Sequence, residues 1–418
     1  MTQVRSATRA EQVEDRRELW VSTGRPTLAV VAVIVCAAIP PFLVGALAPL
    51  IGDDLPFRAT DVGISIAAYY LVSGLLSPLG GRLVHRIGVV SALRLSCLTT
   101  TVGLLGIAVA TEALHITLAL ALLGIPNSVV QPAANAALAE VRTPRLQALV
   151  FGTVQASIPT ATLVAGVVLG VASYAGGWRW TVLSVVSLTL VALWLTRGLP
   201  PATRRSDPAT QGVGRDAQAL PSTPWILVAL VATGFLASIA ATSLPSYISS
   251  TGLATGLAPG LVAGAQVLGS IACATTRIAA PLGISHATTG RRLVLIAVFL
   301  ATGAVGYLLL GTGTVAGFLV GTVVAYAFGW GWNALFNQVV VAVRPHGIAA
   351  ATGMTQGGVF LGGTIGPLAF AAVVYAQGYG AAWVLVSGSA LAAALTAGLA
   401  VIILHRSPSA GRPDRRPA

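Results

Sequence analysis

The chain contains a succession of long apolar runs separated by short polar gaps. A helix that crosses a lipid bilayer needs about 20 mostly apolar residues. Runs of this length lie near residues 28–50, 62–80, 91–111, 116–139, 148–173, 179–196, 225–248, 257–280, 293–311, 315–340, 352–376 and 381–404. None shows the period-two alternation of strands in a membrane barrel. The sequence therefore predicts an all-α membrane protein with twelve transmembrane helices.

The composition supports a chain whose main partner is the lipid bilayer. Hydrophobic residues make up 55% of the 418 residues and charged residues only 9%, against about 25% charged residues in soluble proteins. All 24 basic side chains are Arg, and they lie in the gaps between apolar runs rather than among stacking aromatic residues. We therefore expect no nucleic-acid partner. The three cysteines have no metal or disulfide spacing, so we expect no metal site.

The distribution of arginine predicts the orientation in the membrane. Cytoplasmic loops carry an excess of basic residues. If the N-terminus is cytoplasmic, the inner gaps and helix ends hold 22 Arg and the outer gaps hold only Arg58 and Arg179. This count places Arg94 and Arg277 at inner helix ends, where their side chains would reach the inner surface. Both termini are thus predicted to be cytoplasmic, in a multi-pass protein of the cytoplasmic (inner) membrane.

The longest gap divides the chain into two halves. Residues 198–224 contain five prolines among Arg, Asp and Gly, a composition typical of a flexible linker. We predict a cytoplasmic tail over 1–27, a six-helix bundle over 28–197, the linker over 198–224, a second six-helix bundle over 225–404 and a cytoplasmic tail over 405–418.

The two halves resemble each other in sequence. Gln131, Asn135 and Arg142 align with Asn333, Asn337 and Arg344 at an offset of 202 residues. FGTVQAS, which contains Gln155, aligns with TGMTQGG, which contains Gln356, at an offset of 201. Matches on two adjacent helices at nearly equal offsets indicate an internal duplication. Duplicated halves are a feature of secondary transporters, whose substrate site lies between the repeats.

These features together resemble the major facilitator superfamily. That family carries the signature Gly-x-Leu-x-Asp-Arg-x-Gly between its second and third helices, and this chain has Gly81, Leu83, His85, Arg86 and Gly88 at those positions. GWRW at 177–180, GWGWNALFN at 329–337 and GGTIGP at 362–367 are also similar to the family. QPAAN at 131–135 and the GWGW helix resemble its cyanate and nitroimidazole-type branch. The use of Arg alone as the basic residue, with much Ala, Val and Gly, suggests a bacterial protein. The resemblance implies a major facilitator fold and transport by alternating access.

His85 departs from the signature, which has an acid at this position. In the family, the Asp and Arg of this loop form a latch between the halves. One interpretation is a weaker or pH-sensitive latch, because imidazole titrates near neutral pH. The other is that His85 is a solvated loop residue and that Arg86 and helix dipoles form the latch. We therefore predict a gating loop of Gly81, His85, Arg86 and Gly88.

Polar side chains within the apolar runs are candidates for the substrate site. Such groups are costly in lipid and tend to face a cavity, although they also serve as hydrogen bonds between helices. Amide side chains form pseudo-symmetric stripes on helices that line or flank the cavity in the family, and aromatic residues accompany them near mid-span. The predicted cavity residues are Asn127, Gln131, Asn135, Gln155, Tyr326, Trp330, Asn333, Asn337 and Gln356.

Charged side chains are scarce deep in the spans. Proton-coupled members of the family usually carry a buried carboxylate, and here only helix-end acids, Asp61, Glu112 and Glu140, or His85 could serve. Because Arg94 and Arg277 are expected at the inner surface, the cavity would lack the buried Arg pair of family members that carry phosphorylated or nitrate-like anions, which favours a neutral or weakly polar small-molecule substrate. We expect a monomer without a cofactor, with proton coupling as an open possibility.

Three functional classes compete. The first is a secondary active transporter of a small organic compound, with efflux of drugs or metabolites as the alternative within the same superfamily. The second is a transport-inactive membrane sensor, which the altered signature and missing carboxylates would suit. The third, an enzyme, is disfavoured because no nucleophile–base pair, metal cluster or phosphate loop is recognisable.

Overall fold

The computed structural model describes residues 24–138, 144–175, 177–199, 224–284, 287–343 and 348–406. For residues 135–138, 144–151, 175 and 348–350 only the backbone is described. All regular elements in these ranges are helices, joined by short turns. The helices are α2 (Arg25–Gly52), α3 (Ala59–Ile87), α4 (Val89–Ala108), α5 (Ala113–Leu138), α6 (Pro144–Ala175), α7 (Trp178–Leu195), η2 (Thr196–Gly198), α8 (Pro224–Ala254), α9 (Pro259–Gly283), α10 (Thr289–Leu310), α11 (Val315–Val324), η3 (Ala325–Gly329), α12 (Asn333–Val343) and α13 (Ile348–Arg406).

Eleven helices in the described ranges are long and apolar enough to cross a membrane. The last, α13, has 59 residues, and a straight helix of that length would measure about 90 Å, roughly three times the hydrocarbon thickness. It is interrupted at Gly378, whose backbone has φ 83° and ψ 177°. This left-handed φ favours glycine. The break separates residues 348–377 from 379–406, near the gap that the sequence predicts between its last two runs.

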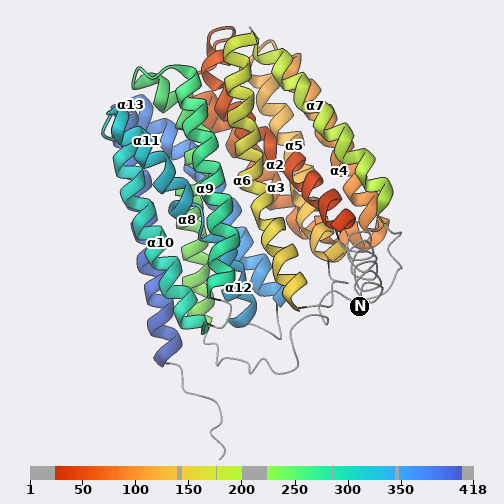
Figure 1. The fold of residues 1–418 in the computed structure, drawn as a ribbon, viewed down its shortest axis with the longest axis vertical. Helices are drawn as coiled ribbons and strands as arrows, with labels where there is room; N and C mark the ends of the chain where they lie inside the picture. The colour runs from red at the N-terminus through yellow and green to blue at the C-terminus, as the bar shows by residue number, and fades with distance from the viewer. Residues whose placement is uncertain are drawn as a thin grey trace, which may run out of the picture.

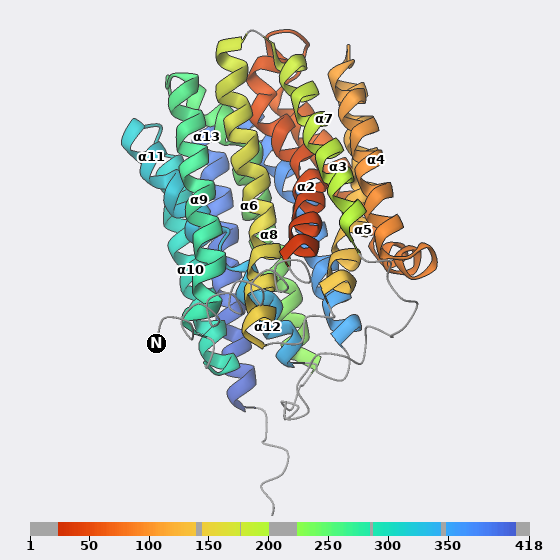
Figure 2. The same cartoon turned by 45° about the vertical axis from the view of Figure 1, so that its right-hand side comes forward.

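The helices form two groups that lie side by side (Figures 1 and 2). The N-terminal half, α2–α7, is held together by packing of α3 on α5, α4 on α5 and α7, and α2 on α6. The C-terminal half, α8–α13, is built around α13, which packs on α8 and α10. Between the halves, α6 packs on α9, α3 on α13 and α2 on α8. The first described helix begins, and the last one ends, toward the lower end in Figure 1.

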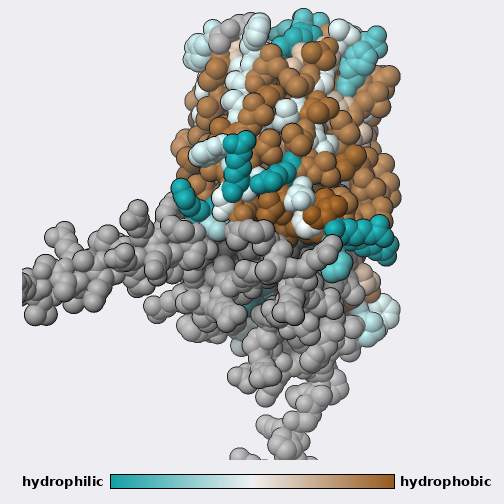
Figure 3. All heavy atoms as spheres, turned by 90° about the vertical axis from the view of Figure 1, so that its right-hand side faces the viewer, coloured by the Kyte–Doolittle hydropathy of each residue, from teal (hydrophilic) through white to brown (hydrophobic). Residues whose placement is uncertain are grey.

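The outer wall of the molecule has the properties of a lipid-facing surface. Figure 3 shows hydrophobic side chains covering most of the face that it presents, with hydrophilic ones mainly toward the ends. The highly exposed aromatic residues Tyr174, Trp180, Trp225 and Tyr375 all lie within a few residues of a helix end or break. Trp and Tyr prefer the membrane–water interface. The exposed aromatic residues therefore mark two interfacial zones.

The buried apolar residues form one cluster within each half and one between them. The first cluster includes Val33, Leu93 and Val130 of the N-terminal half. The second includes Leu230 and Ile296 of the C-terminal half. The third spans both halves, so the interface between them is apolar, and any polar group in it is conspicuous.

Candidate functional site

The predicted amides of the N-terminal half have different surroundings. Asn127 in α5 donates from Nδ2 to Ser73 Oγ in α3 over 3.0 Å. This bond joins two helices of the same half, as expected of an amide that acts between helices. Gln131 is half-buried. The side chains of Asn135 and Glu140 lie outside the described residues.

The predicted amides of the C-terminal half lie on α12 and α13. Asn337 donates from Nδ2 to Asn333 Oδ1, one helical turn earlier, over 3.2 Å. Both side chains are half-buried, as is Gln356 in α13. Their role in lining a cavity stays a prediction.

The helix that carries the GWGW sequence is broken. After α11 it passes through the π-helical turn η3, leaves helical geometry over residues 330–332 and resumes as α12. A Cβ at Gly331 would lie 2.1 Å from the Ala327 carbonyl oxygen, and a Cβ at Gly329 would lie 2.6 Å from the Tyr307 hydroxyl. Only glycine permits these approaches. The paired glycines are the sequence signal for the break, which sequence reasoning missed.

The aromatic residues at this break meet the N-terminal half. The centroid of the Trp330 ring lies 5.6 Å from that of Phe42 in α2 and 5.7 Å from that of Tyr326. The Trp330 and Phe42 rings meet edge to face. Trp330 is 5% exposed and Tyr326 is 0% exposed. The Tyr326 hydroxyl has no hydrogen-bond partner among the described residues. Two predicted cavity residues thus lie at the contact between the halves.

The expectation that Arg277 reaches the inner surface is wrong. Its side chain is 1% exposed. Nε and Nη2 donate to the Trp330 carbonyl oxygen over 3.2 and 2.9 Å, and Nη1 donates to the Gln155 carbonyl oxygen in α6 over 3.1 Å. The broken helix frees a carbonyl that accepts from the guanidinium, so the side chain turns inward. Arg94, by contrast, is exposed and donates to Thr196 Oγ1.

Further hydrogen bonds join the same two helices of opposite halves. Thr162 Oγ1 in α6 and Ser270 Oγ in α9 lie 2.9 Å apart. Gln266 donates from Nε2 to the Thr162 carbonyl oxygen over 3.2 Å. Gln155, itself buried, belongs to this seam. Sequence reasoning singled out Gln155 alone, since isolated Ser and Thr residues give no pattern.

The predicted gating loop is mostly helix. Gly81, His85 and Arg86 lie in the last two turns of α3, and only Gly88, with φ 83°, forms the turn to α4. His85 and Arg86 are exposed, and neither makes a hydrogen bond or ion pair within the described ranges. The interpretation of His85 as a solvated residue and that of a latch formed in another conformation both remain predictions.

The predicted proton sites lie at helix ends. Asp61 accepts from the Arg58 backbone N–H over 2.7 Å at the start of α3, which is an N-terminal capping contact. Glu112 is exposed in the connection before α5.

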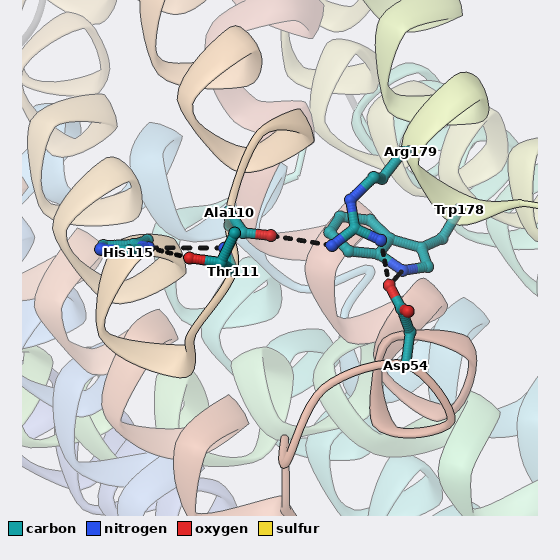
Figure 4. Close-up of polar contacts among 6 residues, drawn as sticks. All are labelled: Asp54, Ala110, Thr111, His115, Trp178 and Arg179. Carbon is teal, nitrogen blue, oxygen red and sulfur yellow. Dashed lines mark hydrogen bonds and ion pairs between the residues drawn. The ribbon is translucent and has the colours of Figure 1, made fainter.

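Asp54 forms a polar cluster that the sequence did not single out (Figure 4). Its carboxylate pairs with Arg179 and accepts from Trp178 Nε1 over 3.1 Å. Arg179 also donates to the Ala110 carbonyl oxygen over 2.9 Å. The hydrogen bonds from Arg179 and then Trp178 lower the pKa of Asp54. The cluster ties together the α2–α3, α4–α5 and α6–α7 connections of one half.

At the same end of the bundle the two halves are in close contact. The Tyr247 hydroxyl in α8 lies 3.1 Å from the Ala59 carbonyl oxygen and 2.9 Å from that of Pro367 in α13. A Cβ at Gly45 in α2 would lie 2.8 Å from Ser246 Cα. A cavity of about 230 Å³ lies beside this contact, lined by residues of both halves that include Pro49, Arg58, Ser250 and Tyr379.

Comparison with known proteins identifies the family. The sequence model of the Major Facilitator Superfamily matches residues 30–367. The chain belongs to the Major Facilitator Superfamily. It is a multi-pass membrane protein of a transporter family, which confirms the resemblance seen in the sequence. No curated protein sequence matches it.

Solved structures show the same fold. The chain is similar to the crystal structure of the human organic anion transporter MFSD10 (TETRAN), with a TM-score of 0.64 and 15% sequence identity. The match covers 89% of this chain and 99% of the human one. At this identity the likeness extends to the fold alone.

Proposed function

We propose that this major facilitator is a secondary active transporter that moves a small organic compound across the cytoplasmic membrane by alternating access. The supporting observation is the cluster of Phe42, Gln155, Arg277 and Trp330, where polar groups meet at a helix break between the halves. Discontinuous helices at a repeat interface are where secondary transporters bind their substrates.

The topology we propose has twelve spans with both termini in the cytoplasm. The break at Gly378 supports two spans within α13. The distribution of arginine supports the orientation. In this orientation the end with Asp54 and Tyr247 is extracellular. The bundles at 28–197 and 225–404 are the moving units, and the linker 198–224 lies almost entirely outside the described residues.

The contacts at Tyr247 support a conformation closed toward the outside. In the proposed cycle, opening this end separates Tyr247 from Ala59 and Gly45 from Ser246, while the opposite end closes. The substrate then enters or leaves near Trp330. The direction of transport, uptake or efflux, follows from the gradient that drives it.

The test uses purified protein in liposomes with an imposed pH gradient and an internal pH-sensitive dye. Matched panels of small organic acids, amides and heterocycles are added one compound at a time, with radiolabelled uptake in parallel. We expect at least one compound to collapse the gradient or to equilibrate only when protein is present. Protein-free liposomes and liposomes with Gly45→Leu, which blocks closure of α2 on α8, are the controls. Transport that is unchanged by Gly45→Leu would contradict alternating access at this interface.

A further inference from the structure

No described residue provides a counter-ion to the Arg277 guanidinium. Residues 217–413 contain no Asp or Glu. Within the described ranges, the acids of the N-terminal half lie in the connections between helices or at a helix end, and the one ion pair is that of Asp54 with Arg179. A buried charge is costly unless it is paired. The protein nevertheless places a permanently charged side chain, 1% exposed, at the contact between its two halves.

The hydrogen bonds of Arg277 satisfy part of its donors and none of its charge. A guanidinium has five N–H groups, and three donate to carbonyl oxygens of Trp330 and Gln155. Beyond these three bonds one N–H remains on each Nη nitrogen, and the guanidinium also has a hydrogen bond with the Cys273 side chain. The Cys273 thiol lies beside the guanidinium, one turn earlier in α9. A carbonyl carries no net charge, and the Trp330 ring, whose centroid lies 5.2 Å from Cζ, offers a cation–π contact but no negative countercharge.

Two neighbouring hydroxyl groups lack a hydrogen-bond partner among the described residues. The hydroxyls of Tyr307 and Tyr326 are fully buried and have no hydrogen-bond partner among the described residues. Both tyrosines lie close enough to Cys273 to interact with it electrostatically, as does Arg277. A buried hydroxyl normally finds a partner. Unused O–H donors beside an unpaired cation favour an anionic acceptor.

Capping of the broken helix does not by itself explain an arginine. The Trp330 carbonyl needs an N–H donor, which a neutral amide also supplies. Arginine brings charge and a planar fork suited to carboxylates. Moreover, Nη1 reaches across the interface to Gln155, so a ligand on this nitrogen would compete with a contact between the halves. Binding and the relative movement of the halves would thereby be coupled.

We propose that Arg277 binds the anionic group of the transported compound, a small organic monoanion such as a carboxylate. The aromatic rings of Phe42, Tyr326 and Trp330 would contact its apolar body. The proposal rests on the proposed transport function and replaces the expected neutral substrate with an anionic one.

The test measures the charge preference of the site through Cys273. In a Cys36→Ala, Cys97→Ala background, Cys273 is the single thiol. Membrane vesicles of both orientations are treated with an anionic (ethylsulfonate) or a cationic (ethyltrimethylammonium) methanethiosulfonate reagent. Each rate is divided by the rate of the same reagent with a free thiol in solution. With Arg277 present, we expect this normalised rate to be about tenfold higher for the anionic reagent than for the cationic one. Because the ratio is taken at the same thiol, changes in thiol reactivity cancel.

The variants separate charge from structure. Arg277→Gln should bring the ratio to about one, and Arg277→Lys, which keeps the charge, should retain most of the preference. Arg94→Gln, which removes an exposed arginine of α4, should leave it unchanged. If Arg277→Gln does not fold, the ratio measured on the parent protein with Arg277 still tests the proposal. A ratio at or below one, a ratio unchanged in a folded Arg277→Gln protein, or an unreactive Cys273 would each overturn the proposal.

Labelling requires no transport, so the two proposals fail separately. An Arg277-dependent preference in a protein that transports nothing would preserve the anion site and refute transport. Transport of neutral compounds with a ratio of one would do the reverse.

Discussion

The Tyr247 hydroxyl lies 3.1 Å from the Ala59 carbonyl oxygen and so links α8 to the start of α3 across the two halves. It also lies 2.9 Å from the Pro367 carbonyl oxygen. One O–H proton serves both acceptors. The Gly63 backbone permits this arrangement, because a Cβ there would lie 2.8 Å from the Pro367 oxygen and 2.9 Å from the hydroxyl.

Replacement of this hydroxyl should favour opening of the Asp54 end. Tyr247→Phe removes a hydrogen bond of about 1 kcal/mol net, equivalent to about a fivefold change in an equilibrium. The measurement is the labelling rate of Ser246→Cys, a buried position beside Gly45, in a background without other cysteines. We expect about fivefold faster labelling. Tyr375→Phe, on an exposed side chain, is the matched control, and equal rates in both variants would contradict a gating contact.

Neighbouring glycines at the end of α3 should respond in opposite ways to alanine. A Cβ at Gly80 would lie 2.3 Å from the Ser128 carbonyl oxygen in α5. A Cβ at Gly81 would have no neighbouring atom within 4 Å. Gly80→Ala forces α3 and α5 apart and should destabilise the protein by about 1–3 kcal/mol. Gly81→Ala should leave the apparent Tm of the detergent-solubilised protein unchanged or raise it. A loss of transport in Gly81→Ala without a loss of Tm would favour the gating role of this position.

The presence of membrane-length helices followed from the sequence, because a bilayer imposes a minimum apolar length that the runs display directly. Their ends did not follow. The run at 62–80 became Ala59–Ile87, since Gly81 and the charged residues after it continue the helix. The turn falls at Gly88, where φ is positive.

The candidate site was predictable only in part. Tyr326 and Trp330 stood out because such residues are unusual near mid-span. Arg277 was misplaced because the expectation considered only its distance to the surface. The carbonyl oxygen of Trp330, freed by the break beside Gly331, supplies an inward partner. Hydrophobic patterning predicts where helices lie. It does not predict which backbone carbonyl oxygens lose their helical hydrogen bond at a break.

The Asp54 cluster should make stability depend on acid. Hydrogen bonds from Arg179 and Trp178 lower the pKa of Asp54, so the stabilisation is present above the ordinary aspartate pKa of about 3.9. It is lost as pH falls through the lowered value. Asp54→Asn should lower the apparent Tm at pH 7, by no more than about 3 °C for an exposed pair, and should flatten its decline in acid.

The control for this prediction is the neighbouring exposed carboxylate. Asp53→Asn removes one negative charge, as Asp54→Asn does, but leaves the contacts of Arg179 and Trp178 intact. It should leave the pH dependence of the apparent Tm unchanged. A double-mutant cycle of Asp54→Asn with Arg179→Gln should show that the two effects do not add. Additive effects would argue against the pair as the origin of the acid dependence.

The amides of α5 and α12 should differ in what their removal affects. Asn127 donates to Ser73 within one half, so Asn127→Ala should cost about 0.6 kcal/mol of stability and leave transport per folded molecule unchanged. Among the described residues, the Asn337 side chain forms a hydrogen bond only with Asn333 of its own helix. Its other hydrogen-bonding positions are therefore available to a ligand. Asn337→Ala should therefore reduce transport by about 2- to 10-fold at unchanged Tm. The measurement is initial transport rate per folded protein in liposomes, and unchanged kinetics in Asn337→Ala would remove that amide from the substrate site.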